Sequence, residues 1–258
     1  MVVEAALAGV CPDAEPGLRE ALLYPIQTGG KRIRPLLCLA AAESVGGDAA
    51  AALSPALALE LVHTYSLVHD DLPAMDDDDE RRGRPTVHIV YGEATAILVG
   101  DALLTAAFEQ VADSPILVRE LARAAGGAGM VGGQYLDICG NVDGIEALKH
   151  LHRLKTGALL RAAVRMGGVV GGASQLQLQA LARYGEAVGL AFQIADDVLD
   201  ADEVTEDAGP PSYVRLLGVD GARAEARRLV QEATTAVGEL PRPQFLLLLA
   251  EFVAARAF

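Results

Sequence analysis

Apolar residues recur at spacings of three and four along almost the whole chain. The segment LSPALALELVHTYSLVHDD, residues 53–71, begins with a Ser-Pro start signal and then places Leu57, Leu61 and Tyr65 on one helical face. The segment GEATAILVGDALLTAAFEQVA, residues 92–112, is apolar nearly all round, which is typical of a buried helix. Aromatic residues make up only 4% of the chain while Ala and Leu abound, and this mixture favours helix over sheet. The pattern predicts an all-α fold.

Chain length, composition and repeats indicate the domain organisation. A chain of 258 residues leaves one or two domains open, but no shift in composition marks a boundary and no long repeat is visible. We therefore expect a single helical domain over residues 1–258. The least helical segment is DADEVTEDAGPPSY, residues 200–213, whose acids, prolines and glycine predict an exposed loop.

Charge and composition exclude several classes of protein. The formal charge of -14 argues against a nucleic-acid-binding protein, whose affinity would come from basic patches. The three cysteines (Cys11, Cys38 and Cys139) are widely spaced, so we expect them to be small buried residues rather than metal ligands or disulfides. The first residues lack the basic region of a signal peptide, and no window of about 18 uncharged apolar residues occurs. We expect a cytoplasmic protein with no membrane span.

The first acidic cluster is the segment HDDLPAMDDDDERRGRP, residues 69–85. Seven of the eleven residues from Asp70 to Glu80 are acids, and Arg81 and Arg82 follow at once. Like charges this dense destabilise a fold unless a counter-charge neutralises them. Asp70, Asp71 and Asp76 are therefore candidate ligands of a divalent cation. An acidic run is commonly only a solvated face, and that interpretation stays open for the last three acids: Asp78, Asp79 and Glu80.

The second acidic cluster lies in FQIADDVLD, residues 192–200. Asp196 and Asp200 lie one above the other on one helical face, Gln193 precedes them by a turn, and Asp197 is adjacent. Bare carboxylates are costly in such an apolar segment. Hard oxygen ligands suit magnesium, which takes one or two carboxylates together with substrate phosphates.

Basic residues supply the other half of the candidate site. TGGKRIRP, residues 28–35, places Lys31, Arg32 and Arg34 directly after a glycine pair, where a backbone can approach an anion. HRLKTG adds Lys155 and Thr156, and His63 lies two helical turns before Asp70. A lone helical histidine is more often structural than a ligand. Two acidic and three basic clusters with apolar surroundings suit one or more diphosphates that carry an apolar tail.

Six motifs together resemble the polyprenyl diphosphate synthases, the trans-isoprenyl chain-elongating enzymes. They are GGKRIRP, HTYSLVHDDLPAMDDDDERRGRPTVH, GEATAILVGDALLTAAFE, GMVGGQYLD, HRLKTGALL and FQIADDVLD, and they appear in the family's order from residue 29 to residue 200. The resemblance implies an all-helical bundle around a deep central cavity, usually in a homodimer. It implies a short-chain prenyltransferase that joins an allylic diphosphate to isopentenyl diphosphate.

The resemblance also implies roles for individual residues. Magnesium would be held by Asp70, Asp71, Asp76, Asp196, Asp197 and Asp200. The allylic diphosphate would be bound by Arg81, Lys155, Thr156 and Gln193, and isopentenyl diphosphate by Lys31, Arg34, His63 and Arg82. The catalytic residues would be Asp70, Asp71, Asp76, Arg81, Lys155 and Asp196. Tyr65 and Ser66 would set the chain length, and the aromatic residue there favours farnesyl over geranylgeranyl diphosphate.

One departure from the family pattern leaves alternatives open. Where family members carry lysines after the second acidic motif, this chain has a shorter, lysine-free loop with Pro210, Pro211, Ser212 and Tyr213. Each lost charged hydrogen bond to a diphosphate costs about 1.5–3 kcal/mol. A weakly active or non-catalytic regulatory subunit of a heteromeric synthase is thus an alternative, as is a terpene cyclase on the same fold. A cyclase needs only one diphosphate site, whereas GGKRIRP supplies a second.

Overall fold

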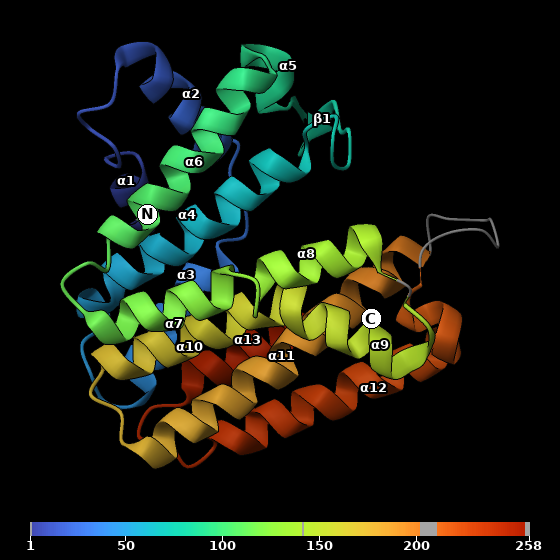
Figure 1. The fold of residues 1–258 in the computed structure, drawn as a ribbon. Helices are drawn as coiled ribbons and strands as arrows, with labels where there is room; N and C mark the ends of the chain where they lie inside the picture. Colours follow the sequence, from blue (N-terminus) through green and yellow to red (C-terminus); the bar gives the residue numbers. More distant parts are fainter. Residues whose placement is uncertain (1, 141, 202–210, 256–258) are drawn as a thin grey trace. The chain divides into compact units, whose positions relative to one another are not determined.

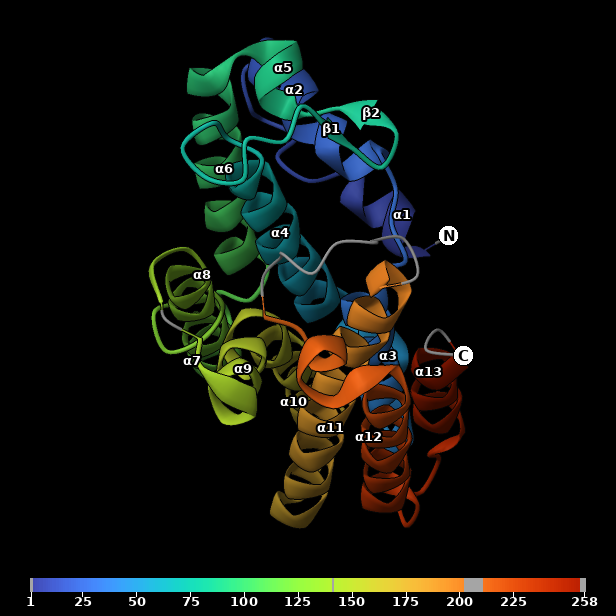
Figure 2. The same ribbon diagram turned by 90° about the vertical axis from the view of Figure 1, so that its right-hand side faces the viewer.

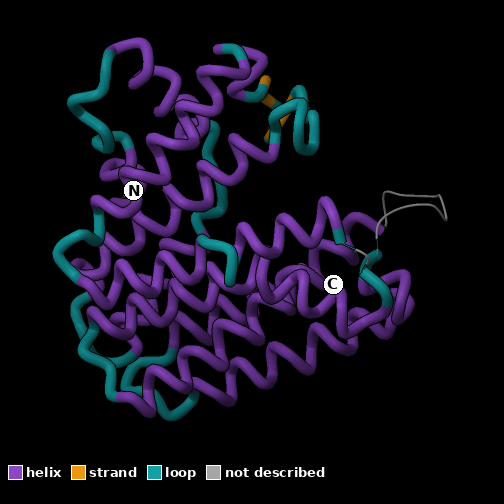
Figure 3. The backbone as a smooth tube through the Cα atoms, in the orientation of Figure 1, coloured by secondary structure: helices purple, strands orange, loops and turns teal. Residues whose placement is uncertain are grey.

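The computed structural model describes residues 2–140, 142–201 and 211–255. The chain divides into two compact units, of which unit 1 comprises Met1–Leu36 and Leu53–Val118, and unit 2 comprises Leu37–Ala52 and Arg119–Phe258. Helices dominate both units, and the described residues contain only two strands, each of two residues (Figures 1 and 3). The prediction of an all-α fold is confirmed. That of a single domain stays a prediction.

Unit 1 is built around one buried helix. Its elements are α1 (Val2–Leu7), α2 (Pro16–Gln27), α4 (Leu53–Asp70), β1 (Glu80–Arg81), β2 (Arg84–Pro85), α5 (Val87–Tyr91) and α6 (Glu93–Glu109). Helix α4 packs along α6, and both views show the two helices side by side (Figures 1 and 2). Residues 55–62 of α4 are buried without interruption. The helix that carries the first acidic cluster is therefore the core of its unit.

The segment Ala49–Asp70 is long and apolar enough to cross a membrane, which differs from our expectation. Only Glu60 and the terminal Asp70 bring charge to α4. However, 67% of the most apolar window is buried inside the structure. The core helix of a folded domain passes the same test of length and composition. The absence of a membrane span stays a prediction.

Helices α4 and α6 approach closely at Gly100. A Cβ atom added there would overlap the ring of His69, whose Nε2 lies 3.1 Å from the carbonyl oxygen of Ile97. The buried face of α6 includes Ala96, Val99 and Gly100. Its other face is open, because Leu98 is 57% exposed and Ile97 is 46% exposed. The expectation that this helix is buried all round was therefore wrong.

Unit 2 contains the two longest helices of the described residues, α11 with 27 residues and α12 with 25. Its elements are η1 (Ala49–Ala52), α8 (Met130–Cys139), α9 (Gly144–His152), the π-helical turn η2 (Arg153–Gly157), α10 (Ala158–Val170), α11 (Gln175–Ala201), α12 (Tyr213–Val237) and α13 (Gln244–Ala255). Helices α3 (Ile33–Ser44) and α7 (Pro115–Ala125) are each divided between the units. Helices α11 and α12 lie side by side in Figures 1 and 2. Helix α11 therefore carries the second acidic cluster against α12.

The cysteines differ from one another in burial. All three thiols are free; Cys38 is buried, Cys11 is partly buried and Cys139 is exposed. The expectation of burial was thus right for Cys38, where burial raises the pKa of the thiol. It was wrong for Cys139, because α8 ends at this residue on an open face that also exposes Tyr135 and Ile138.

Candidate active site

The first acidic cluster begins where α4 ends. The Asp71 N–H still completes the helix by donating to the Leu67 carbonyl, at 3.1 Å. The chain then turns back, and the Asp76 N–H donates to the carbonyl of Asp70 at 2.8 Å. Asp70 is partly buried and Asp76 is exposed. This closed loop brings two predicted metal ligands together although five residues separate them in the sequence.

Asp71 has different surroundings from its two neighbours in the cluster. Its side chain is 5% exposed, and its Oδ1 accepts a hydrogen bond from the Nε of Arg81 at 2.6 Å. Burial raises the pKa of this carboxyl group, and the Arg81 guanidinium opposes that rise. Arg81 also forms an ion pair with Asp78 at 3.4 Å. One oxygen of Asp71 therefore positions Arg81, and its role as a metal ligand stays a prediction.

The acids at the end of the run match the solvated interpretation. Asp78, Asp79 and Glu80 are all exposed. Glu80 and Arg81 form β1, which pairs with β2 so that Arg81 lies opposite Arg84. The hairpin returns the chain after the acidic run and presents Arg81 and Arg82 beside the end of α4.

The basic loop meets Arg82 at the glycine pair. An Arg82 nitrogen donates to the carbonyl of Gly29, and a Cβ atom on Gly30 would lie 2.8 Å from the Arg82 guanidinium. Gly29 and Gly30 have φ angles of 80° and 154°, a region that L side chains rarely adopt. Lys31 is exposed, and Arg34 is partly buried. The structure thus brings Arg82 to the loop that carries two of the other predicted contacts to isopentenyl diphosphate, Lys31 and Arg34.

His63 faces the same group of arginines from α4. Burial lowers the pKa of its imidazole well below the usual value, and four arginines lower it further: Arg34, Arg82, Arg81 and Arg32. The ring is therefore neutral at pH 7 and offers one N–H donor. This electrostatic coupling places His63 with the basic loop, as the sequence predicted.

The two residues predicted to set chain length are held by α4 itself. Tyr65 is 6% exposed, and its ring lies edge-on to His69 with centroids 5.8 Å apart. The Ser66 hydroxyl donates to the carbonyl of His63 at 2.9 Å. Their role in product length stays a prediction.

In unit 2, Lys155 and Thr156 lie on the π-helical turn η2. Such turns are frequently found at functional sites. Lys155 forms an ion pair with Asp137 of α8. A Cβ atom on Gly133 would overlap the backbone nitrogen of Lys155, so only glycine lets α8 lie this close to the turn. Asp137 was missed by sequence reasoning, although the quoted motif GMVGGQYLD ends on it.

A chain of hydrogen bonds links three elements of unit 2. The Thr156 hydroxyl donates to Oε1 of Gln193 at 3.2 Å, and Nε2 of Gln193 donates to Oδ1 of Asp197 at 3.3 Å. Oδ2 of Asp197 accepts the backbone N–H of Tyr213 at 2.7 Å. Asp197 therefore ties the second acidic cluster to the start of α12, while Asp196 lies beside it, partly buried.

Some predictions fall outside the described residues. Asp200 lies in α11, but its side chain is not among those described, and the lysine-free loop falls mainly in residues 202–210, which are also outside them. Pro211 is described and exposed, and Ser212 accepts a hydrogen bond from the Arg215 N–H as the N-cap of α12.

Magnesium fits the donor set. Among the described residues, no group of three or more His, Cys, Asp or Glu side chains is arranged to hold a metal ion alone. Magnesium is commonly bound by one or two carboxylates plus substrate phosphates, so it does not need a complete protein cage. The accessible carboxylates of Asp70 and Asp76, brought together by the closed loop, match that requirement.

Helical units that carry acidic and basic clusters of this kind are typical of enzymes that act on diphosphate esters. Residues 15–213 match the family model described as polyprenyl synthetase. The chain belongs to this family.

Known proteins give the same result. Geranylgeranyl pyrophosphate synthase 12, chloroplastic, of Arabidopsis thaliana is 45% identical over 257 residues, which cover 90% of this chain and 71% of the relative. The solved apo structure of an FPP/GFPP synthase from Zymomonas mobilis is 36% identical with a TM-score of 0.90, covering 98% of this chain and 94% of the other. A putative farnesyl-diphosphate synthase from Marinomonas sp. MED121 has a TM-score of 0.83 at 39% identity, with the same coverage. The prediction of a short-chain prenyltransferase is confirmed.

Proposed function

We propose that this enzyme joins isopentenyl diphosphate to an allylic diphosphate with the help of Mg²⁺, and releases farnesyl or geranylgeranyl diphosphate. The observation that carries the proposal is the arrangement of unit 1. A closed acidic loop at the end of α4 adjoins four cations and a neutral imidazole that donates one N–H: the cations are Lys31, Arg34, Arg81 and Arg82, and the imidazole is that of His63. Acids that bind a divalent cation and cations that bind a second diphosphate are the two parts that such a condensation needs.

Mg²⁺ would be held by Asp70 and Asp76 of unit 1 and by Asp196, Asp197 and Asp200 of unit 2, with Asp71 as a further candidate. When bound, it would act as a Lewis acid that stabilises negative charge on the departing diphosphate. The two acidic clusters belong to different units.

The chain's own cations would assist the same bond cleavage. As the allylic carbon–oxygen bond breaks, the leaving diphosphate gains negative charge, which Arg81 and Lys155 would stabilise through preorganised N–H donors. Asp71 holds Arg81 in place, and Asp137 holds Lys155. The Thr156 hydroxyl and the Gln193 amide would orient that diphosphate. The allylic cation then accepts the double bond of isopentenyl diphosphate, and the proton that is lost passes to the released diphosphate.

Product length is proposed to depend on α4. Tyr65 is fixed by burial and by its edge-on contact with His69, and it lies five residues before Asp70. The fifteen-carbon product stays a prediction, while a relative named for the geranylgeranyl product is 45% identical to this chain. Gas chromatography of dephosphorylated products would distinguish fifteen from twenty carbons.

We also propose a homodimer. Four large apolar residues remain exposed on α5 and α6 of unit 1: Ile89 at 50%, Val90 at 45%, Ile97 at 46% and Leu98 at 57%. Exposed apolar groups on adjacent helices are typical of protein–protein contact surfaces. A cytoplasmic location stays a proposal.

The test is incubation of the purified protein with dimethylallyl and isopentenyl diphosphates, with and without Mg²⁺. Elongated diphosphates that form only with the metal support the proposal. Release of a hydrocarbon would instead indicate a cyclase, and no turnover would indicate a non-catalytic subunit.

A second test is the variant Asp70→Ala. Because it removes a carboxylate that would hold Mg²⁺, we expect turnover to fall by about 100-fold or more. Asp70 lies at the end of α4 and is partly open to solvent, so the fold itself should be little affected. The free energy of unfolding should change by about 1 kcal/mol or less. Full activity in this variant would show that the acidic loop is not the metal site.

A further inference from the structure

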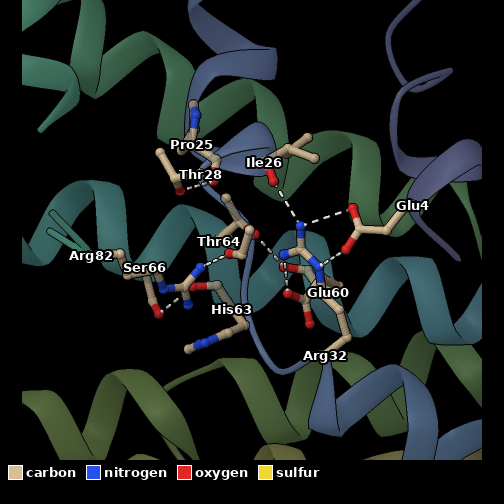
Figure 4. Close-up of polar contacts among 11 residues, drawn as sticks. Glu4, Pro25, Ile26, Thr28, Arg32, Glu60, His63, Thr64, Ser66 and Arg82 are labelled. Carbon is tan, nitrogen blue, oxygen red and sulfur yellow. Dashed lines mark hydrogen bonds and ion pairs between the residues drawn. The ribbon is translucent and has the colours of Figure 1, made fainter. Parts of the chain in front are cut away.

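Arg32 lies between Lys31 and Arg34 in the sequence of the basic loop, but its guanidinium is paired with two carboxylates inside the protein. Its Nε donates to Oε1 of Glu4 at 2.7 Å, and one terminal nitrogen reaches Oε2 of the same carboxylate at 3.2 Å. Its other terminal nitrogen donates to Oε1 of Glu60 at 2.6 Å. The first terminal nitrogen also donates to the carbonyl of Ile26 at 2.6 Å. Figure 4 shows the guanidinium enclosed by these partners.

The backbone at Arg32 is strained. Its φ angle is 50°, in the left-handed region that disfavours side chains with a Cβ atom. The residue is only 9% exposed, and its partner Glu60 has a side chain that is 3% exposed. A strained backbone around a buried charge persists only when the surrounding contacts determine it. The four hydrogen bonds of the guanidinium supply those contacts.

These bonds fix the start of α3. The Arg32 carbonyl accepts the N–H of Leu36 at 3.0 Å, so the chain enters the helix at this residue. Lys31 is the residue before it, and Arg34 lies in the first helical turn after it. The positions of both cations therefore depend on the conformation of Arg32.

Glu60 also connects the loop to His63. The two residues lie three positions apart on α4, which places them on neighbouring parts of one helical face. Glu4 and Ile26 add anchors on α1 and α2. Since the guanidinium of Arg32 is paired with two carboxylates and donates to them, it is not available to bind a substrate.

We propose that Arg32 is a positioning residue: its ion pairs with Glu4 and Glu60 hold the loop so that Lys31, Arg34 and His63 bind the diphosphate of isopentenyl diphosphate. This inference rests on the proposed function. It predicts that substitutions of Arg32, Glu4 and Glu60 weaken the binding of isopentenyl diphosphate and leave the binding of the allylic diphosphate unchanged.

The experiment measures kcat and both Michaelis constants for the variants Arg32→Lys and Glu60→Gln. Lysine keeps the charge but cannot make the forked contacts of a guanidinium. We expect KM for isopentenyl diphosphate to rise by about tenfold in each variant, while KM for the allylic diphosphate stays within about twofold. The double variant should raise KM for isopentenyl diphosphate little more than either single variant does, because both substitutions break the contact between Arg32 and Glu60.

A matched control is the ion pair of Arg165 with Glu120 in unit 2, whose contacts of 2.8 Å and 2.9 Å are also bidentate. Arg165→Lys should lower the unfolding temperature and leave the ratio of the two Michaelis constants unchanged. Glu4→Gln is the mild variant, because the Glu4 side chain is 50% exposed and its loss leaves the Glu60 pair intact. It should raise KM for isopentenyl diphosphate by about threefold and stay folded even where Glu60→Gln does not.

Unchanged KM for isopentenyl diphosphate in folded Arg32→Lys and Glu4→Gln would overturn the inference. An equal rise in both Michaelis constants would overturn it as well, because that result indicates a general loosening of the fold. If the unsubstituted enzyme makes no elongated product at all, the proposed function itself has failed, which is a separate outcome.

Discussion

At the residue scale, His152 is a buried ionisable group that makes stability depend on pH. Its ring is 7% exposed and lies 5.6 Å from that of Tyr213, and Nδ1 is buried without a hydrogen-bond partner among the described residues. Burial lowers the pKa of this imidazole from 6.5 to about 4. Between those two values the unfolded chain binds a proton that the folded protein does not. Stability is therefore lost as the pH falls through this window.

We expect His152→Phe, which keeps an aromatic ring but cannot titrate, to remove that loss. On lowering the pH from 6.5 to 4.5, the free energy of unfolding of the unsubstituted protein should fall by about 2 kcal/mol more than that of the variant. Urea titrations at several pH values measure this difference. Parallel pH profiles would mean that His152 binds its proton equally well in the folded and unfolded states, so that its pKa is not lowered by folding.

Residue types and spacing predicted much of the candidate site. Asp70, Asp76 and Arg82 were singled out from the sequence, and the structure brings each of them to a loop with the expected neighbours. The partners of Arg32 could not be predicted, because Glu4 and Glu60 each lie 28 residues away and no local pattern links them. Its left-handed backbone could not be anticipated either, since arginine does not favour that region.

At the scale of elements, the π-helical turn depends on a glycine of another helix. A Cβ atom on Gly133 would overlap the Lys155 backbone nitrogen and would lie 2.5 Å from its Cα. Backbone atoms cannot yield as a flexible side chain can, so Gly133→Ala must push α8 away from the turn. We expect KM for the allylic diphosphate to rise by about tenfold, because Lys155 moves with the turn.

The control is Gly17→Ala in the first turn of α2, where no atom lies within 4 Å of the added Cβ. Alanine favours the helix there and should stabilise the protein by about 0.5–1 kcal/mol without changing either Michaelis constant. Steady-state kinetics and thermal unfolding of the two variants measure the contrast. The steric argument fails if Gly133→Ala behaves like Gly17→Ala.

Helical periodicity predicted the helices α4 and α6, and it predicted the helical character of the rest of the chain without giving the bounds of each element. It did not predict that residues 144–170 divide into α9, the turn η2 and α10, because one wider turn barely changes the apolar pattern. The kink in α12 at Gly218, with φ 70° and ψ 164°, was missed for a similar reason. A glycine inside an apolar helical pattern does not by itself distinguish a kink from a close helix contact.

At the scale of the whole molecule, the exposed face of α5 and α6 predicts self-association. Leu98 is 57% exposed beside Ile97, and both lie on a helix whose other face is buried. We expect Leu98→Asp to shift the protein from dimer to monomer in sedimentation velocity, since a charge desolvated in an apolar interface is costly. Thr235→Asp, a charge added at an exposed polar position of α12 in unit 2, is the control. A dimer that persists in Leu98→Asp would exclude this face.

The family and the fold class followed from the sequence because the motifs are local and occur in order. Contacts that join distant segments within one unit are another matter. No periodicity relates Thr156 to Gln193, whose side chains form a hydrogen bond although they lie 37 positions apart in the chain. Only the packing of α11 against the turn η2 determines such a contact, and a one-dimensional pattern does not encode it.

The contact between Gly100 and His69 has a consequence for engineering. His69 fits against α6 only because position 100 has no side chain, and the ring of Tyr65 leans on His69 in turn. A methyl group at position 100 would therefore displace the ring of His69, and the ring of Tyr65 would shift with it although Tyr65 itself is unchanged. Because Tyr65 is proposed to set product length, position 100 on α6 is where directed evolution of that length should begin.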